Sequence, residues 1–371
     1  MSKKQRKSVN KKLGIILLLE FLLLILLVVG YGWYYVNHML NQMQTDTYDK
    51  KEIVVSEAVT EVMKKGYTTI ALFGVDARGG ANMTQAGAAR SDAVIIASIN
   101  NDTKEVKLVS VYRDAFLEIA QQGAGNQKYT HAYFLGGPVC AIETLNKNLD
   151  LNITDYVTVD FKALTNAIDA LGGITINVKA SEIQALNENM VEQMQVTGIQ
   201  SQGVYSAGEQ VLNGTQAVAY ARIRKVGNND FERTQRQRAV IGAMVAKAKQ
   251  SDLSTLTNMI NQIFPQVATN MTNGQLISLA ASVFEYELGE NTGFPLSYQC
   301  PTLGSKGSVV VPANLISNVD YLHEFLYPED KEYTPSSEVQ RINDEISYET
   351  GIYDEFSEED TTEAPTQTNS N

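Results

Sequence analysis

The sequence predicts an α/β fold: a three-layer α-β-α sandwich with a mixed central sheet, preceded by one transmembrane helix. Two observations predict the sandwich. Short apolar runs typical of buried strands alternate with amphipathic segments between residues 66 and 328, and such alternation places helices against a sheet. A hairpin signal near residue 101 adds antiparallel neighbours to that sheet. A third observation, a long apolar run near the N-terminus, predicts the transmembrane helix.

The apolar run Leu13–Val36 spans 24 residues and contains one charged residue, Glu20. As a helix it would be about 36 Å long, enough to cross a hydrocarbon core of about 30 Å. Aromatic residues stand at its far end, and six basic residues precede it, which predicts a cytoplasmic N-terminus and an outward-facing body. A cleaved signal peptide would have a shorter apolar region and small residues at the cut. We expect an uncleaved signal anchor.

The elements of the body follow in order. After a polar linker (37–65), residues 68–75 read as a buried strand, and two apolar runs around Asn101–Lys104 read as a hairpin. A helix is expected after Gly136–Gly137. The remaining expected elements are a strand at 155–160, a helix at 161–171, a strand at 174–178, a helix at 213–222 with Asn213 as N-cap, a helix at 231–249, and helices within 252–288 and 313–326.

Charge divides the chain into three parts. The formal net charge is −12, with six basic and no acidic residues in 1–12, and thirteen acidic against two basic residues in 329–371. The segment 329–371 has few aliphatic residues, which predicts an acidic disordered tail. The body between them, residues 13–328, is therefore mildly acidic, and 66–328 is expected to be one extracellular domain. Such a body without a helix-turn-helix pattern is a poor partner for nucleic acid.

The sequence lacks the motifs of several common catalytic and metal-binding sites. The sequence has no GxSxG elbow and no P-loop, and its three histidines form no Cys/His cluster, so we expect no zinc site. Cys140 and Cys300 are compatible with a disulfide in an outward-facing domain and equally with two separate thiols.

The arginines of the body gather in two windows, residues 78–113 and 222–238, whereas lysine serves the rest of the surface. Arginine offers a planar, permanently charged fork that binds phosphate oxygens in pairs. The gathering predicts a dedicated anion pocket; the alternative is that these arginines are solvated or paired with nearby acids. The eight residues are Arg78, Arg90, Arg113, Arg222, Arg224, Arg233, Arg236 and Arg238.

Carboxylates accompany these arginines. Asp76 follows the first strand, Asp92 opens the next, and Asp230 is expected as the N-cap of the helix that carries Arg233 and Gln237. Carboxylates with arginines form the set used when a bound metal and guanidinium groups stabilise a transferring phosphoryl group. On this interpretation Asp76 and Asp92 hold Mg²⁺ or Mn²⁺, and Asp230 orients or deprotonates an incoming hydroxyl.

The motifs together resemble the LytR–CpsA–Psr family over about residues 66–250. The resemblance implies a membrane-anchored enzyme of the Gram-positive cell envelope, which transfers a glycopolymer (wall teichoic acid, capsule or similar) from an undecaprenyl-pyrophosphate carrier onto peptidoglycan. The segments that carry it are ALFGVDAR (71–78), RSDAVIIASIN (90–100), VKLVSVYRD (106–114), KYTHAYFLGG (128–137), DYVTVDFKALTNAIDALGGITINV (155–178), LNGTQAVAYARIR (212–224) and DFERTQRQRAVI (230–241).

The resemblance also implies roles for individual residues. Asp76 and Asp92 are the metal-linked carboxylates, and Asp230 and Arg113 the catalytic pair. Lys128 and His131 fall in a stretch similar to one that lines the family's site. In the acidic motif Asn228 stands where the family often has a first acid, so no second carboxylate is expected there. The pyrophosphate-binding set comprises Arg78, Arg90, Arg222, Arg224, Arg233 and Gln237.

The resemblance further implies an apolar groove for the lipid beside the sheet. The candidate residues are Phe134, Leu135, Val139, Phe161, Leu164 and Ile168. Each of them also suits plain core packing.

The same sequence features bear on three alternative functions. A hydrolase that trims the lipid carrier would use the same residues with water as acceptor, and the sequence does not separate the two. A non-catalytic binder of polyprenyl phosphate or wall polymer would use the same arginines, but a pure anion receptor gains nothing from acids beside the anion. A DNA-binding regulator conflicts with the acidic, outward-facing body.

Overall fold

The structure is a computed structural model that describes residue 34 and residues 36–45, 50–76, 82–227 and 229–353. The predicted cytoplasmic tail and nearly all of the predicted signal anchor lie outside these residues. Within the described part of the chain, no helix combines the length and apolar character that crossing a bilayer requires.

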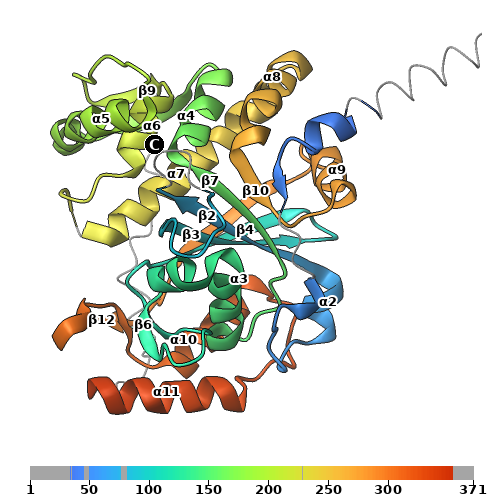
Figure 1. Cartoon of the computed structure of the whole chain (residues 1–371), viewed down its shortest axis with the longest axis vertical. Helices are drawn as coiled ribbons and strands as arrows, with labels where there is room; N and C mark the ends of the chain where they lie inside the picture. The colour runs from blue at the N-terminus through green and yellow to red at the C-terminus, as the bar shows by residue number, and fades with distance from the viewer. Residues whose placement is uncertain (1–33, 35, 46–49, 77–81, 228, 354–371) are drawn as a thin grey trace, which may run out of the picture.

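The core of the molecule is a seven-stranded mixed sheet (Figure 1). Its strands, in spatial order, are β1 (Gln44–Thr45), β10 (Val267–Thr269), β7 (Asp155–Asp160), β2 (Tyr67–Val75), β3 (Ser91–Asn100), β4 (Glu105–Val111) and β11 (Glu287–Phe294). β2 runs parallel to β7, and β4 runs parallel to β11, whereas β3 is antiparallel to both of its neighbours. The predicted mixed sheet is therefore confirmed.

The hairpin between β3 and β4 is confirmed at its expected place. The Asn100 side chain accepts hydrogen bonds from the backbone N–H groups of Asp102 and Thr103, each at 3.0 Å, which closes the turn. Lys104 completes it with φ of 64°. Local turn chemistry thus fixes the register that continues along the whole pair.

Helices cover both faces of the sheet, which confirms the three layers. On one face, Phe73, Ile96 and Val109 pack into a large apolar core with residues of α3, α10 and α11. On the other face, Ile95 and Leu108 lie in a smaller cluster with Ile241 of α7. The helices of these layers are α3 (Thr130–Leu149), α7 (Asn229–Gln250), α8 (Leu253–Ile263), α9 (Asn273–Ala281) and α10 (Leu315–Leu326), and α11 (Ser337–Thr350) packs against α3 and α10.

A smaller unit with its own core lies at one end of the molecule, at the top of Figure 1, while α10 and α11 lie at the opposite end. The predicted N-cap is confirmed, because the Asn213 side chain accepts from the Gln216 N–H and Gln216 bonds back to the Asn213 N–H. The elements of this unit are α4 (Phe161–Ala170), β8 (Ile174–Val178), α5 (Ile183–Thr197), β9 (Gly208–Leu212) and α6 (Gly214–Ala221).

Two predicted boundaries differ from the structure. The helix expected after Gly136–Gly137 begins earlier, at Thr130, and bends at these glycines. Gly137 has φ of 66°, and a Cβ there would overlap the carbonyl oxygen of Thr84, so the bend requires glycine. The region expected to hold only helices, 252–288, also contains β10 and the start of β11, because short strands at a sheet edge carry little local signal.

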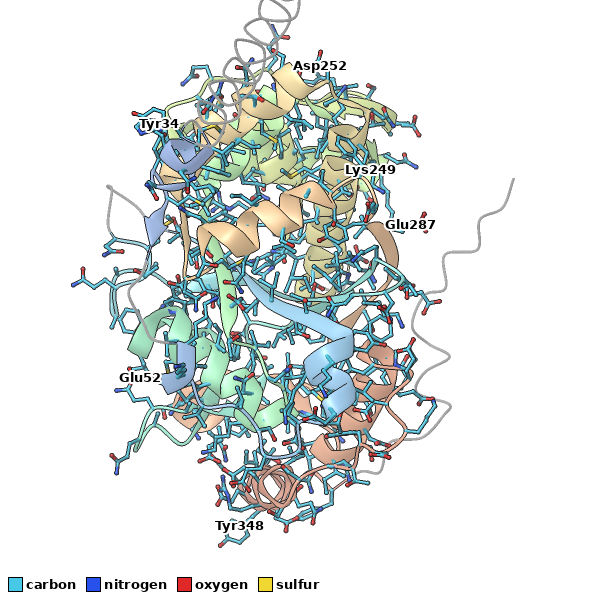
Figure 2. All side chains as sticks on the ribbon, turned by 90° about the vertical axis from the view of Figure 1, so that its right-hand side faces the viewer. Tyr34, Glu52, Lys249, Asp252, Glu287 and Tyr348 are labelled. Carbon is cyan, nitrogen blue, oxygen red and sulfur yellow. The ribbon has the colours of Figure 1, made fainter. Side chains whose placement is uncertain are left out.

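The expectation of a disordered tail from residue 329 is wrong for its first part. Residues 337–350 form α11, which buries Val339, Ile342 and Ile346, spaced three and four residues apart, against the main core. The acidic residues stand on its outer side, and the count of charges concealed this apolar stripe. Figure 2 shows Tyr348 pointing outward at the foot of the molecule.

A buried carboxylate fastens this C-terminal segment. Asp150 ends α3, is fully buried, and accepts hydrogen bonds from Ser336 N (2.8 Å), Ser336 Oγ (2.7 Å), Tyr333 Oη (3.0 Å) and Ser56 Oγ (2.6 Å). Three segments that are distant in the sequence therefore meet at one side chain. Because a buried charge is costly unless it is fully hydrogen-bonded, this junction specifies how the C-terminal segment packs.

Candidate functional site

Strand register brings the predicted carboxylates to one end of the sheet. Val75 lies opposite both Ser91 of β3 and Asp160 of β7, and Val111 lies opposite Phe294 of β11. The residues that follow β2, β4 and β7 and those that open β3 therefore share one edge. Asp76, Asp92, Arg113 and Asp160 all stand there.

Asp92 connects the two arginine windows. Its Oδ1 forms an ion pair with Arg113 Nη1 and lies 3.7 Å from Arg224 Nη2. Arg113 belongs to the first window and Arg224 to the second, so Asp92 brings one arginine of each window together, and both contact a nearby acid as the alternative expected. Arg113 Nε also lies 3.6 Å from Asp114 Oδ1, the same oxygen that lies 3.5 Å from Lys128 Nζ.

The start of α3 forms a second wall of the site. Thr130 donates its N–H to the Arg113 carbonyl at 2.9 Å and its hydroxyl to the Ser91 carbonyl at 3.0 Å. One turn further on, the exposed Arg90 guanidinium lies over the ring of Phe134, with Cζ 5.1 Å from the centroid. Burial, reinforced by the positive charges of Arg90 and Lys128, lowers the pKa of His131. His131 is therefore neutral at pH 7 in a positively charged setting.

Arg222 is held by Phe161, which was predicted for the lipid groove, and by two residues of α5 that were not predicted for the site. Its Cζ lies 4.6 Å from the ring centroid of Phe161, its Nη1 donates to Gln193 Oε1 at 3.2 Å, and its Nη2 lies 3.1 Å from Glu192 Oε1. Gln193 is fully buried in α5. Nothing in the local sequence of α5 marks it as part of the site.

The first turns of α7 lie beside β4. Phe231 packs edge-on against Tyr112, the residue before Arg113, with ring centroids 4.6 Å apart. Arg233 follows and is 2% exposed, and Gln237 is half-buried one turn later. Arg236 and Arg238 face other partners: Arg236 pairs with Glu182 and Glu232, and Arg238 Nε donates to Asn291 at 2.6 Å.

The structure does not describe one predicted residue, and it places another differently from the prediction. Arg78 lies outside the described residues. α7 begins at Asn229, so Asp230 lies within its first turn and is not the N-cap that the sequence predicted. Cap preference locates a helix end only to within one or two residues, and the start of α7 differs from the prediction by that margin.

Asp160 is a carboxylate that the prediction left out. Burial raises its pKa, and the negative charge of Asp76 adds to this effect, whereas the N–H of Ala163, which donates at 2.7 Å, opposes it. Its place in the sequence could have predicted it as a site residue, because Asp160 ends a strand that runs parallel to the strand before Asp76. Carboxyl ends of adjacent parallel strands meet at one edge.

The donor set suits magnesium. Mg²⁺ uses one or two carboxylates and completes its shell with water and substrate phosphate oxygens. Asp76 and Asp92, at the ends of neighbouring strands, would supply two such carboxylates, and a cation there would relieve the repulsion between Asp76 and Asp160. Within the described residues, no group of three or more His, Cys, Asp or Glu side chains forms an all-protein metal cage. Both cysteines are free, which answers the disulfide question.

Comparison with known proteins identifies the fold and the lineage. The sequence profile of the LytR_cpsA_psr family matches residues 31–288. The chain belongs to the LytR_cpsA_psr family. The resemblance drawn from the motifs is thereby confirmed, and the match extends beyond residues 66–250 on both sides.

Curated relatives of this chain include proteins with transferase names. A protein of Enterococcus faecalis named polyisoprenyl-teichoic acid–peptidoglycan teichoic acid transferase TagU is 30% identical over 269 residues, which cover 71% of this chain and 79% of that protein. The Bacillus licheniformis protein of the same name is 32% identical over 206 residues, 55% of this chain and 60% of its own length. The chain thus matches less than two thirds of that relative.

Solved structures of the LytR_cpsA_psr family share the fold. Protein gbs0355 of Streptococcus agalactiae superposes with a TM-score of 0.61 at 23% identity, covering 76% of this chain and 93% of that one. A structure described as TagT bound to LI-WTA gives 0.53 at 22% identity, covering 80% and 97%. One described as YwtF (TagT) with bound octaprenyl pyrophosphate lipid gives 0.50 at 20% identity, covering 80% and 97%.

Proposed function

We propose that this chain is a metal-dependent phosphotransferase that moves an anionic glycopolymer, such as teichoic acid or capsule, from an undecaprenyl-pyrophosphate carrier onto peptidoglycan. The observation that carries the proposal is the position of Asp92 between Arg113 and Arg224, which joins both arginine windows at one edge of the sheet. Family membership and the transferase names of the relatives support it.

The arginines bind the pyrophosphate in this proposal. Arg90 and Arg224 are exposed at the edge, and Arg113 and Arg222 are held by neighbouring side chains. Pre-positioned guanidinium groups stabilise charge that develops on a leaving phosphate without reorganising during the reaction. Arg233, Gln237 and Arg78 complete the proposed pyrophosphate-binding set.

The reaction exchanges one phosphate–oxygen bond for another. A hydroxyl oxygen of peptidoglycan bonds to the phosphorus that carries the polymer, the bridging bond of the pyrophosphate breaks, and polyprenyl phosphate leaves with the electron pair. Asp230 accepts the hydroxyl proton, and Arg113 neutralises charge at the phosphate. Asp76 and Asp92 would hold Mg²⁺ or Mn²⁺, which supplies further positive charge to the phosphate oxygens.

The proposed location follows the sequence pattern. A single span at 13–36 would anchor the chain in the cell membrane of a Gram-positive envelope, with the N-terminus cytoplasmic and the folded domain outside. There the domain would meet both its lipid-linked donor and its peptidoglycan acceptor.

The full chain in detergent micelles, incubated with a polyprenyl-pyrophosphate-linked saccharide, peptidoglycan fragments and Mg²⁺, tests the proposal. The expected result is saccharide joined to peptidoglycan through a phosphodiester. Release of free saccharide phosphate, with the same yield when peptidoglycan is omitted, would identify a hydrolase. Tight lipid binding with no product of either kind would identify a binder that does not turn over.

A further inference from the structure

The segment that carries Arg222 and Arg224 has no regular secondary structure of its own. α6 ends at Ala221, and α7 begins at Asn229. We call residues 222–227 the arginine loop. A loop that must present a guanidinium to an anion needs a fixed backbone, because a displacement of about 1 Å is enough to impair binding or catalysis.

Arg236 supplies that fixation from α7. Its Nη1 donates to the Ile223 carbonyl at 3.1 Å, and its Nη2 donates to the Val226 carbonyl at 3.2 Å. These two carbonyls stand on either side of Arg224. The same guanidinium therefore holds the arginine loop before and after the residue that reaches Asp92.

Two carboxylates hold the Arg236 guanidinium in turn. Nε donates to Glu182 Oε1 at 2.8 Å, and Nη2 donates to Glu232 Oε2 at 2.6 Å. The Arg236 and Glu182 side chains are 4% and 2% exposed, so this group is shielded from water. Glu182 is itself fixed, because its second oxygen accepts the Lys179 N–H at 2.9 Å.

Gly227 fits the same arrangement. It ends the arginine loop with φ of 76°, and a Cβ there would overlap the Glu232 carboxylate. The loop thus passes close against one of the two acids that hold Arg236.

We propose that Arg236 is a positioning residue, which sets the backbone of the arginine loop so that Arg224 faces the pyrophosphate. This inference rests on the proposed function and deepens it. It assigns a role to an arginine that does not itself reach the anion. A lysine would not replace it, because one ammonium lacks the planar fork that reaches two carbonyls and two carboxylates at once.

Binding of octaprenyl pyrophosphate by the full chain in detergent micelles is the measurement. We expect R236K to weaken binding about tenfold, as is typical when an outer residue that orients a ligand-binding group is changed. R238K is the matched control, since Arg238 is buried on the same helix but bonds to Asn291 of β11. We expect R238K to change binding less than about twofold while lowering thermal stability comparably.

A double-mutant cycle separates positioning from general stability. In an R224A background, R236K should cost less than about twofold, because the group that it positions is gone. In an R90A background it should still cost about tenfold, because Arg90 belongs to another segment and its effect should add. An equal loss in both backgrounds, or no effect of R224A alone, would overturn the inference.

If R236K does not fold, Gly227→Ala provides a second test of the same inference. We expect it to weaken binding about threefold or more, because either the loop or the Glu232 carboxylate that holds Arg236 must move. Gly198→Ala is its control, with a similar φ of 75° and open space around the added carbon. Equal effects of the two substitutions on binding would overturn the inference.

Failure of the proposed function and failure of this inference give different results. If the wild-type chain does not bind octaprenyl pyrophosphate, the proposed function fails. If the wild type binds it and R236K and G227A bind it equally well, the positioning role alone fails.

Discussion

The guanidinium of Arg222 lies over the ring of Phe161, with its Cζ 4.6 Å from the ring centroid. Phe161 opens α4, directly after the strand that ends at Asp160. An aromatic face attracts a guanidinium and leaves its N–H groups free to bond at the edge. The ring thus orients Arg222 while Gln193 and Glu192 bind its nitrogens.

Phe161→Leu should weaken binding of octaprenyl pyrophosphate about twofold to fivefold, which corresponds to losing a cation–π contact of about 0.5–1 kcal/mol. Isothermal titration measures the change. Phe325→Leu is the control, because it removes a comparable contact with Lys107 (5.3 Å) far from the site. Equal losses in the two variants would mean that Phe161 contributes only to packing.

Arg113→Lys should lose most transfer activity, about 100-fold, while the chain folds normally. The fork that pairs with Asp92 becomes a point charge, which fits phosphate oxygens less well. Product formation from the lipid-linked saccharide is the measurement. Arg341→Lys on α11, where Arg341 pairs with Glu345 at 2.6 Å, serves as control and should remain active. Full activity of the Arg113 variant would remove Arg113 from the site.

Removing the metal should abolish transfer, and Asp76→Asn should abolish the response to magnesium. Because a ligand that binds only the folded state stabilises it, Mg²⁺ should raise the melting temperature of the wild type. Asp76→Asn should lose this rise, and Asp102→Asn in the exposed β3–β4 turn should keep it. If Mg²⁺ raises the melting temperature of the Asp76→Asn variant as much as that of the wild type, the cation binds elsewhere.

Acid should destabilise the fold through His323. Burial lowers the pKa of His323 to about 4, with Nε2 donating to the Leu149 carbonyl at 2.8 Å. Its ordinary pKa is about 6.5, so the unfolded chain binds more protons between these values, and stability rises with pH there. About 3 kcal/mol should be lost as pH falls from 6.5 to 4. Urea unfolding across this range measures it. In His323→Gln, the free energy of unfolding should depend less on pH over this range. An equal pH dependence in the variant and the wild type would mean that His323 is not the cause.

The parts of the fold that the sequence predicted are those with local causes. The β3–β4 turn is closed by Asn100, and the start of α6 by Asn213, each through bonds within three residues. The edge of the site was predictable for Asp76 and Asp92 because strand ends can be located from apolar runs. α11 was missed because its apolar stripe is narrow among many acids.

The remaining site residues depend on contacts between distant segments. Gln193 reaches Arg222 from a helix in the smaller unit, and Glu182 reaches Arg236 from the segment just before it. Their own neighbours in sequence give no sign of this. Such residues become visible only once α5, α6 and α7 are packed together.

The junction at Asp150 decides where the folding unit ends. A fragment that stops at Pro328 would retain all the proposed site residues, yet Asp150 would lose the three bonds that Ser336 and Tyr333 donate. The carboxylate would then have to draw in water to replace these donors, and the apolar side of α3 and α10 would face solvent. The shortest autonomous form of the described chain therefore extends through α11, which makes the acidic C-terminal stretch, up to Thr350, part of the scaffold.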